Sequence, residues 1–322
     1  MSELLKNIDA RTKLAGTNKL EILLFFLGID QRTGRRETYG INVFKVREVM
    51  RTPVITAAPD MPPSVEGMVS LRGALVPVID LAKYSGISPE TPREIMIVTE
   101  YNGHTQGFLV EGVDTILRLD WSKMRVPPEM LTSQTGGLVT AVTELEDNRL
   151  VMMMDVEKVL SETTNIDNEM MYRGVVAVDR PDSTVFYCDD SSVARKQIER
   201  TLSAMGVRGI SAVNGRQMWE EMEKVATYAQ SVGKPASSMI SLVLTDIEMP
   251  EMDGYILTKK IKSDPRFNGI AVIMHSSLSG MSNQKLGASV GVDEYVPKFE
   301  PLRLSETLAR RLGVENMPVR LA

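Results

Sequence analysis

The chain has 322 residues, of which 43% are hydrophobic and 25% charged, and its formal net charge is −5. This length is enough for about two globular domains, and the composition is that of a globular rather than a disordered protein. The negative net charge argues against nucleic acid as a partner. The single cysteine, Cys188, excludes an intrachain disulfide and a cysteine-cluster zinc site, and it fits a reducing compartment.

The beginning of the chain does not resemble an export signal. Residues 2–15 carry charged side chains and lack a long apolar core, although their leucines favour a short amphipathic helix within residues 1–18. No apolar stretch approaches the roughly 18 residues that a membrane-spanning helix needs. We therefore expect a cytoplasmic protein with no direct membrane insertion.

Residues 19–160 are predicted to form a β-rich domain. The run from Leu20 to Leu27 is apolar without alternation, which is typical of a strand buried on both faces. Further short apolar runs cover residues 39–46, 68–72, 75–79, 94–99, 107–110 and 150–154. Many short strands with regular turn signals indicate barrels or sandwiches. The domain gathers no nucleophile, base and oxyanion donors, which favours a binding module over an enzyme.

Residues 161–183 are polar and rich in turn formers, and we interpret them as a linker. Residues 184–313 alternate short apolar runs with helix-patterned stretches, and residues 314–322 form a tail. The expected strands are 185–188, 207–213, 240–244, 270–275 and 294–296, and the expected helices are 192–205, 215–231, 254–263, 281–289 and 302–312. Five such units predict a doubly wound α/β domain with a parallel sheet.

Polar side chains follow four of these strands at the point where each strand ends. Asp189 and Asp190 follow the first strand, Asp246 the third, Ser276 the fourth and Lys298 the fifth. The carboxyl ends of parallel strands line one crevice, so these side chains should meet there. Three carboxylates repel one another unless a divalent cation joins them, and Mg²⁺ takes carboxylate and phosphate oxygens. The pattern predicts phosphoryl transfer to a carboxylate, although Asp190 could alternatively cap the helix that follows it.

The chain contains two histidines, and neither supports a phosphohistidine relay within the molecule. His104 lies in a predicted turn and His275 in a predicted strand, each without a second histidine or an acid at metal-ligand spacing. If Asp246 receives a phosphoryl group, the donor is therefore another molecule.

The segments YCDDS, VLTDIEMPEMDG, IMHSS and YVPK resemble the signature of two-component receiver domains, the family typified by the chemotaxis regulator CheY. The resemblance covers residues 184–313 and implies that Asp246 is the phosphoacceptor. It implies a set of Mg²⁺ ligands, namely Asp189, Asp190, Asp246 and the backbone carbonyl of Glu248. It also implies phosphoryl-stabilising roles for Ser276 and Lys298, and Tyr295 as the aromatic whose burial reports activation. Receivers usually carry a proline after this lysine, often with a cis peptide, whereas here Phe299 follows.

The segment GMVSLRGALVPVIDL, residues 67–81, resembles the most recognisable stretch of CheW-type coupling domains. The resemblance covers about residues 19–160 and implies two small β-barrels. It also implies binding to chemoreceptor signalling tips and to the histidine kinase CheA. Arg72, Val76 and Val78 are the predicted partner-binding residues, although Arg72 could alternatively brace the turn at Gly73.

A coupling domain followed by a receiver is the arrangement of the CheV family of chemotaxis scaffolds. The resemblance implies an adaptor rather than an enzyme, located at cytoplasmic receptor arrays and regulated by phosphorylation of Asp246. An alternative is that the receiver acts mainly as a phosphate sink for the kinase.

Overall fold

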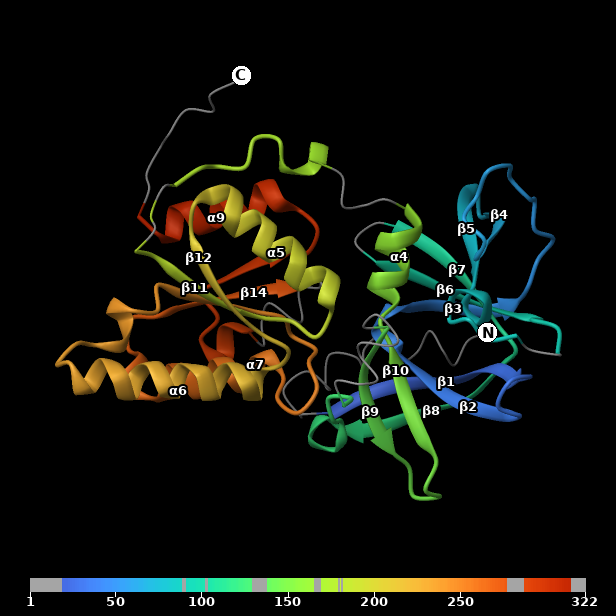
Figure 1. Cartoon of the computed structure of the whole chain (residues 1–322), viewed down its shortest axis with the longest axis horizontal. Helices are drawn as coiled ribbons and strands as arrows, with labels where there is room; N and C mark the ends of the chain where they lie inside the picture. Colours follow the sequence, from blue (N-terminus) through green and yellow to red (C-terminus); the bar gives the residue numbers. More distant parts are fainter. Residues whose placement is uncertain are drawn as a thin grey trace. The chain divides into compact units, whose positions relative to one another are not determined.

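The structure is a computed structural model, and it divides the chain into two compact units, residues 19–164 and a second unit that starts at residue 165. The described residues are 19–88, 91–101, 104–128, 138–164, 169–178, 180, 182–276 and 287–313 (Figure 1). The predicted helix within residues 1–18, the predicted tail and most of the predicted helix 281–289 lie outside these residues. No helix among the described residues is long and apolar enough to span a membrane.

In its described residues the first unit contains two five-stranded sheets, with strand orders β8-β1-β2-β10-β9 and β3-β6-β7-β5-β4. The strands are β1 (Lys19–Asp30), β2 (Arg35–Asn42), β3 (Val46–Arg51), β4 (Val65–Leu71), β5 (Ala74–Asp80), β6 (Ile95–Tyr101), β7 (His104–Val110), β8 (Gly112–Asp120), β9 (Val139–Glu144) and β10 (Leu150–Met154). The helical elements are η1 (Val43–Lys45), α2 (Leu81–Tyr84), η2 (Trp121–Lys123) and α4 (Val156–Thr164).

Strand β1 is buried on both faces, as its unbroken apolar run predicts. Leu23 and Phe25 pack into a hydrophobic cluster that also contains Ile79 and Phe108 of the other sheet. The alternate residues, such as Leu24, pack into a separate cluster on the opposite face. Because the side chains of a strand alternate between its two faces, β1 contributes to two hydrophobic clusters. One cluster contains residues of both sheets, and the other lies on the opposite face of the β1 sheet.

Three strands of the first unit, β3, β8 and β9, were not predicted, although the predicted strand 39–46 includes the first residue of β3. Most residues of β8 are exposed or half-buried, so the strand presents no continuous apolar run to find. Strand β9 alternates buried residues with half-buried or exposed ones over only six positions, which is a weak signal without its partner β10. The predicted strand 39–46 is displaced, because β2 ends at Asn42, whose side chain accepts a hydrogen bond from the Phe44 N–H and starts η1.

The second unit is the predicted doubly wound α/β domain. Its strands are β11 (Thr184–Cys188), β12 (Arg208–Ala212), β13 (Leu242–Thr245), β14 (Ala271–Ser276) and β15 (Glu294–Pro297), in the order β12-β11-β13-β14-β15. All four pairings are parallel. The described helical elements are η3 (Glu169–Tyr172), α5 (Ser192–Met205), α6 (Gly215–Ser231), η4 (Ala236–Ser238), α7 (Gly254–Ser263), η5 (Pro265–Phe267) and α9 (Pro301–Arg311).

Helices cover both faces of this sheet. Residues of α5 and α9 pack with β11, β13 and β15 in one cluster, and residues of α6 and α7 form a second cluster on the opposite face (Figure 1). Because both faces are covered, the central strands are apolar throughout, and their polar residues are displaced to the strand ends. This arrangement places the candidate site at the carboxyl edge of the sheet.

The predicted linker, residues 161–183, is partly structured. Helix α4 of the first unit continues to Thr164. In the second unit, the Val178 N–H donates to the carbonyl of Met205 at 2.9 Å, and the Val176 N–H donates to the Ser305 hydroxyl at 3.2 Å. Both valines pack against the cluster formed by α5 and α9. The segment around residues 175–178 therefore lies against the receiver-like unit.

Candidate functional site

Two adjacent strand ends bring the three acidic residues together. Cys188 and Thr245, the last residues of β11 and β13, are partners in the parallel register, and the Asp246 N–H donates to the Cys188 carbonyl at 2.9 Å. Carboxylate oxygens of Asp189, Asp190 and Asp246 all lie within 4.8 Å of one another. The strand pairing therefore produces the acidic cluster that the sequence predicts.

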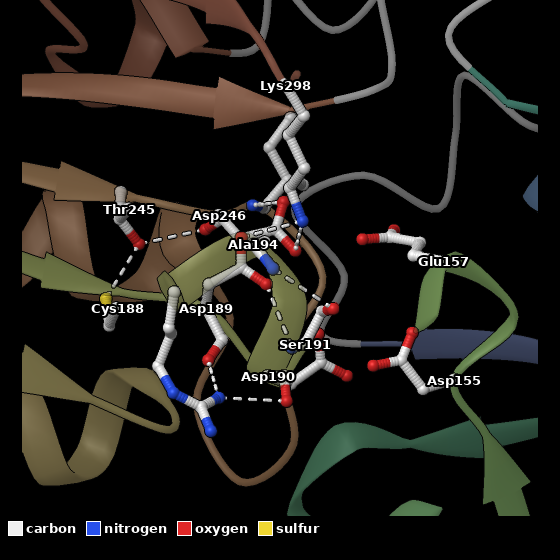
Figure 2. Close-up of polar contacts among 12 residues, drawn as sticks. Asp155, Glu157, Cys188, Asp189, Asp190, Ser191, Ala194, Thr245, Asp246 and Lys298 are labelled. Atoms are coloured by element: carbon white, nitrogen blue, oxygen red, sulfur yellow. Dashed lines mark hydrogen bonds and ion pairs between the residues drawn. The ribbon is translucent and has the colours of Figure 1, made fainter. Parts of the chain in front are cut away.

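Lys298 reaches this cluster from the end of β15. Its Nζ lies 2.7 Å from Asp189 Oδ2 and 3.0 Å from Asp246 Oδ2, and the residue is only 1% exposed (Figure 2). The Lys298 N–H donates to the carbonyl of Ser276 at 3.3 Å, which ties the lysine to the end of β14. Four of the five predicted residues thus meet in one cluster, and Ser276 closes the neighbouring strand as a buried residue.

The charges of this cluster fit a divalent cation. Three carboxylates and one ammonium group leave two negative charges in a largely buried setting. Burying unbalanced charge is costly, and carboxylate oxygens are the ligands that Mg²⁺ prefers. Glu248, whose carbonyl is the fourth predicted ligand, lies in the loop after β13 and is half-buried.

Asp190 does not cap the helix that follows it. The N-cap of α5 is Ser191, whose hydroxyl accepts a hydrogen bond from the Ala194 N–H at 3.4 Å. The Ser191 N–H in turn donates to Asp189 Oδ1 at 2.9 Å. The structure therefore rules out the capping alternative and leaves the Asp190 carboxylate facing the other two acids.

The loop after β13 holds the Asp246 backbone against the start of α7. The Ile247 N–H donates to Asp246 Oδ1 at 2.7 Å, and the Gly254 N–H donates to the Ile247 carbonyl at 2.9 Å. A Cβ atom at Gly254 would lie 2.0 Å from the Asp246 carbonyl oxygen and 3.1 Å from Thr245 Oγ1. Only glycine permits this approach, since the nearest atom belongs to the backbone.

Gly254→Ala is expected to destabilise the second unit by about 2 kcal/mol, because the new methyl group must displace the Asp246 backbone. Thermal unfolding of the full chain measures the loss. Gly112→Ala on β8 is the matched control, since a Cβ atom there meets nothing within 4 Å. Equal unfolding temperatures for the two variants would contradict the close approach at Gly254.

A chain of hydrogen bonds below the acids was not predicted. The Thr245 hydroxyl donates to the Asp246 carbonyl at 2.8 Å, and the Cys188 thiol donates to Thr245 Oγ1 at 3.2 Å. Burial raises the pKa of the Cys188 thiol, which keeps it protonated as a donor. Both residues lie inside apolar runs, so the sequence gives no signal that distinguishes them from core residues.

Phe299 takes a left-handed backbone conformation in place of the usual proline. Its φ is +61°, and none of the described peptide bonds is cis. This conformation is unfavourable for a bulky residue, at about 1 kcal/mol. The Phe299 side chain is buried, and α9 begins two residues later at Pro301. The loop after Lys298 therefore reaches α9 through a trans peptide.

Tyr295, the predicted switch residue, is half-buried in a small cluster with Tyr255 and Met274. Its hydroxyl is hydrogen bonded to that of Tyr255 and accepts the backbone N–H of Gly287. Burial is the main cause that raises the pKa of each tyrosine. Tyr255 was not predicted, because an aromatic residue in the first turn of an amphipathic helix is ordinarily a core residue.

In the first unit the structure corrects two of the predicted partner-binding residues. Val76 and Val78 are 1% and 0% exposed and belong to the core cluster of their sheet, so their side chains cannot contact a partner. Successive side chains of a strand point to opposite faces, and Leu75, 72% exposed, occupies the outward face of β5.

Arg72 lies in the two-residue turn between β4 and β5. Arg72 and Gly73 both have positive φ, +50° and +85°, which is the pattern of a type I′ hairpin. The Arg72 guanidinium is exposed and pairs with Glu48 of β3 at 2.9 Å. The side chain thus links the hairpin to β3, which is the opposite edge strand of the sheet.

Comparisons with known proteins match both units. Residues 25–164 match the CheW-like domain family, and residues 185–309 match the response regulator receiver domain family. The chain is 29% identical over 301 residues to chemotaxis protein CheV3 of Helicobacter pylori, covering 92% of this chain and 95% of that protein.

Each half of the chain is also similar to single-domain chemotaxis proteins. Chemotaxis protein CheW of Klebsiella aerogenes is 32% identical over 163 residues, which cover 49% of this chain and 93% of that protein. Chemotaxis protein CheY1 of Helicobacter pylori is 34% identical over 130 residues, which cover 40% of this chain and 95% of that protein. The predicted fold class is confirmed: a β-rich CheW-like domain precedes a receiver with a parallel sheet. The chain belongs to the CheV family of chemotaxis proteins and is a coupling scaffold with a phosphorylatable receiver domain.

Proposed function

We propose that this protein couples the cytoplasmic tips of chemoreceptors to the histidine kinase CheA, and that phosphorylation of Asp246 regulates the coupling. The supporting observation is that one chain carries a CheW-like domain and an acidic cluster with Lys298 Nζ 2.7 and 3.0 Å from two of its carboxylates. The domains would comprise residues 19–160 and 184–313, joined by 161–183. The protein would act in the cytoplasm at receptor arrays, and its exposed Arg72 hairpin is a candidate partner contact.

In the proposed reaction an Asp246 carboxylate oxygen attacks the phosphorus of a CheA phosphohistidine in line. The N–P bond breaks as the new O–P bond forms, and the product is an acyl phosphate on Asp246. The Lys298 ammonium lies 3.0 Å from Asp246 Oδ2 and would pair with the incoming phosphoryl oxygens. Ser276, at the end of the neighbouring strand, would donate a hydrogen bond to one of them. Such transfers depend mainly on positioning and charge neutralisation.

The residues fit a bound Mg²⁺. Asp189, Asp190 and Asp246 would hold it, together with the backbone carbonyl of Glu248. The cation would supply positive charge against the charge that develops on the transferring group. The Lys298 ammonium group already lies beside Asp189 and Asp246. Because it is part of the chain, the protein itself supplies some of the positive charge that neutralises the site.

Regulation would proceed through Tyr295. When Ser276 moves toward the phosphoryl group, space opens behind it, and the Tyr295 ring would enter that space. Beyond its own phosphorylation and dephosphorylation, the protein would catalyse no reaction and act as an adaptor. A phosphate sink remains the second candidate, because it requires the same acidic cluster but no change in coupling.

Sedimentation of the full chain with receptor-containing membranes and CheA tests the proposal. We expect co-sedimentation, with an affinity that changes by roughly 5- to 150-fold on addition of acetyl phosphate, the usual range of allosteric coupling. Asp246→Asn should co-sediment with no response to the phosphodonor. Unchanged wild-type affinity despite full phosphorylation would favour the sink, and failure to co-sediment would contradict the scaffold.

A further inference from the structure

Arg195 contacts the acidic pair from its backbone side. Its Nη1 donates to the carbonyl of Asp189 at 2.6 Å and to that of Asp190 at 3.0 Å. We propose that Arg195 is a positioning residue for the cation site: it fixes the two peptide groups from which the Asp189 and Asp190 side chains project. This inference rests on the proposed Mg²⁺ site and adds a residue to it.

The contact constrains where both carboxylates can point. Consecutive carbonyls that accept from one guanidinium nitrogen must face it together, and this fixes the orientation of the backbone between β11 and α5. The Asp189 side chain is held independently, since its Oδ1 accepts the Ser191 N–H at 2.9 Å and its Oδ2 lies 2.7 Å from Lys298. The Asp190 carboxylate is more exposed, and its backbone is the part that Arg195 restrains.

Helix stability does not account for an arginine at this position. Arg195 lies near the N-terminus of α5, four residues after the N-cap Ser191. A positive charge there opposes the helix dipole, which favours anions at this end. Among the described residues, its side chain donates to two backbone carbonyl oxygens, and these belong to the proposed Mg²⁺ ligands Asp189 and Asp190. The charged hydrogen bonds compensate for the unfavourable placement.

Two possible roles of Arg195, a nearby positive charge or a positioning residue, predict opposite changes in Mg²⁺ affinity when its side chain is removed. If the guanidinium acts only as a nearby positive charge, Arg195→Met should tighten Mg²⁺ binding, because the guanidinium would no longer repel the cation. If Arg195 positions the acids, the same change should weaken binding. Residues that orient metal ligands typically contribute 10- to 100-fold in metal affinity, so we expect a loss of about 10-fold.

The test is a Mg²⁺ titration of the full-length protein, followed by backbone amide chemical shifts. Arg195→Met should bind about 10-fold more weakly than the wild type, and Arg195→Lys should fall between them, since it keeps the charge and one donor. Lys196→Met is the control, because it removes an exposed positive charge from the next position of the same helix. It should leave the affinity unchanged.

Acetyl phosphate labelling supplies a second readout. At saturating Mg²⁺ the labelling rate of Arg195→Met should return to within about threefold of the wild type, because positioning affects cation affinity rather than the transfer step. Equal or tighter binding by Arg195→Met, or an equal loss in Lys196→Met, would overturn the inference. If Arg195→Met does not fold, wild-type affinity in Arg195→Lys overturns it and weaker affinity supports it. Absence of Mg²⁺ binding in the wild type would instead show that the proposed site itself is wrong.

Discussion

Asp246→Asn is expected to abolish labelling of the chain by acetyl phosphate and by phosphorylated CheA. The amide keeps the volume of the side chain, and its oxygen can still accept the Ile247 N–H, which donates to Asp246 Oδ1 at 2.7 Å. It lacks the ionised oxygen that must attack phosphorus. Phosphoryl labelling is measured as radiolabel on the protein or as a change in the mass of the intact protein. Chelation of Mg²⁺ should reduce labelling of the wild type to a similar extent.

Asp253→Asn is the matched control for this prediction. Asp253 lies in the same loop and is buried, but it caps α7, where it accepts the Ile256 N–H at 2.7 Å. Asparagine caps helices about as well as aspartate, so labelling should persist. If Asp246→Asn is labelled as strongly as the wild type, Asp246 is not the acceptor.

The receiver was predictable in detail because its signals are local. Helices α5, α6 and α7 begin and end at the predicted residues, and their N-caps are Ser191, Asn214 and Asp253, which are all good capping residues. Four of the five strands are short, largely apolar runs with a polar side chain at or just after their end, and the edge strand β12 is the exception. Parallel pairing then brings these ends together without any further information.

Features that depend on the backbone or on distant strands were not predictable. Val76 and Val78 were expected to face a partner, but the pairing of β5 with β4 and β7 turns them into the core and leaves Leu75 outside. A shift of one residue exchanges the two faces of a strand, and the sequence of β5 is apolar on both. Arg195 was missed because it binds carbonyl oxygens, which every residue carries.

Lys298→Ala is expected to have the largest effect on stability. Lys298 is 1% exposed and lies between Asp189 and Asp246, so its removal leaves buried carboxylates without their cation. Loss of one partner of a buried ion pair costs about 3 kcal/mol or more. Thermal or denaturant unfolding without Mg²⁺ measures this loss, and added Mg²⁺ should recover part of it by binding the folded state.

The Lys298→Ala variant also distinguishes Mg²⁺ binding from the response of the protein to phosphorylation. Mg²⁺ binding should persist, because the acids remain and a competing charge 2.7 Å from Asp189 Oδ2 is gone. Labelling should be slow, and phosphodonor should change coupling little, because no ammonium pairs with the phosphoryl group. Lys262→Ala is the control: its ion pair with Asp293 at 2.6 Å is partly exposed, and such pairs contribute at most about 1 kcal/mol. Loss of Mg²⁺ binding in Lys298→Ala alone would mean that the lysine shapes the acidic cluster instead of serving the phosphoryl group.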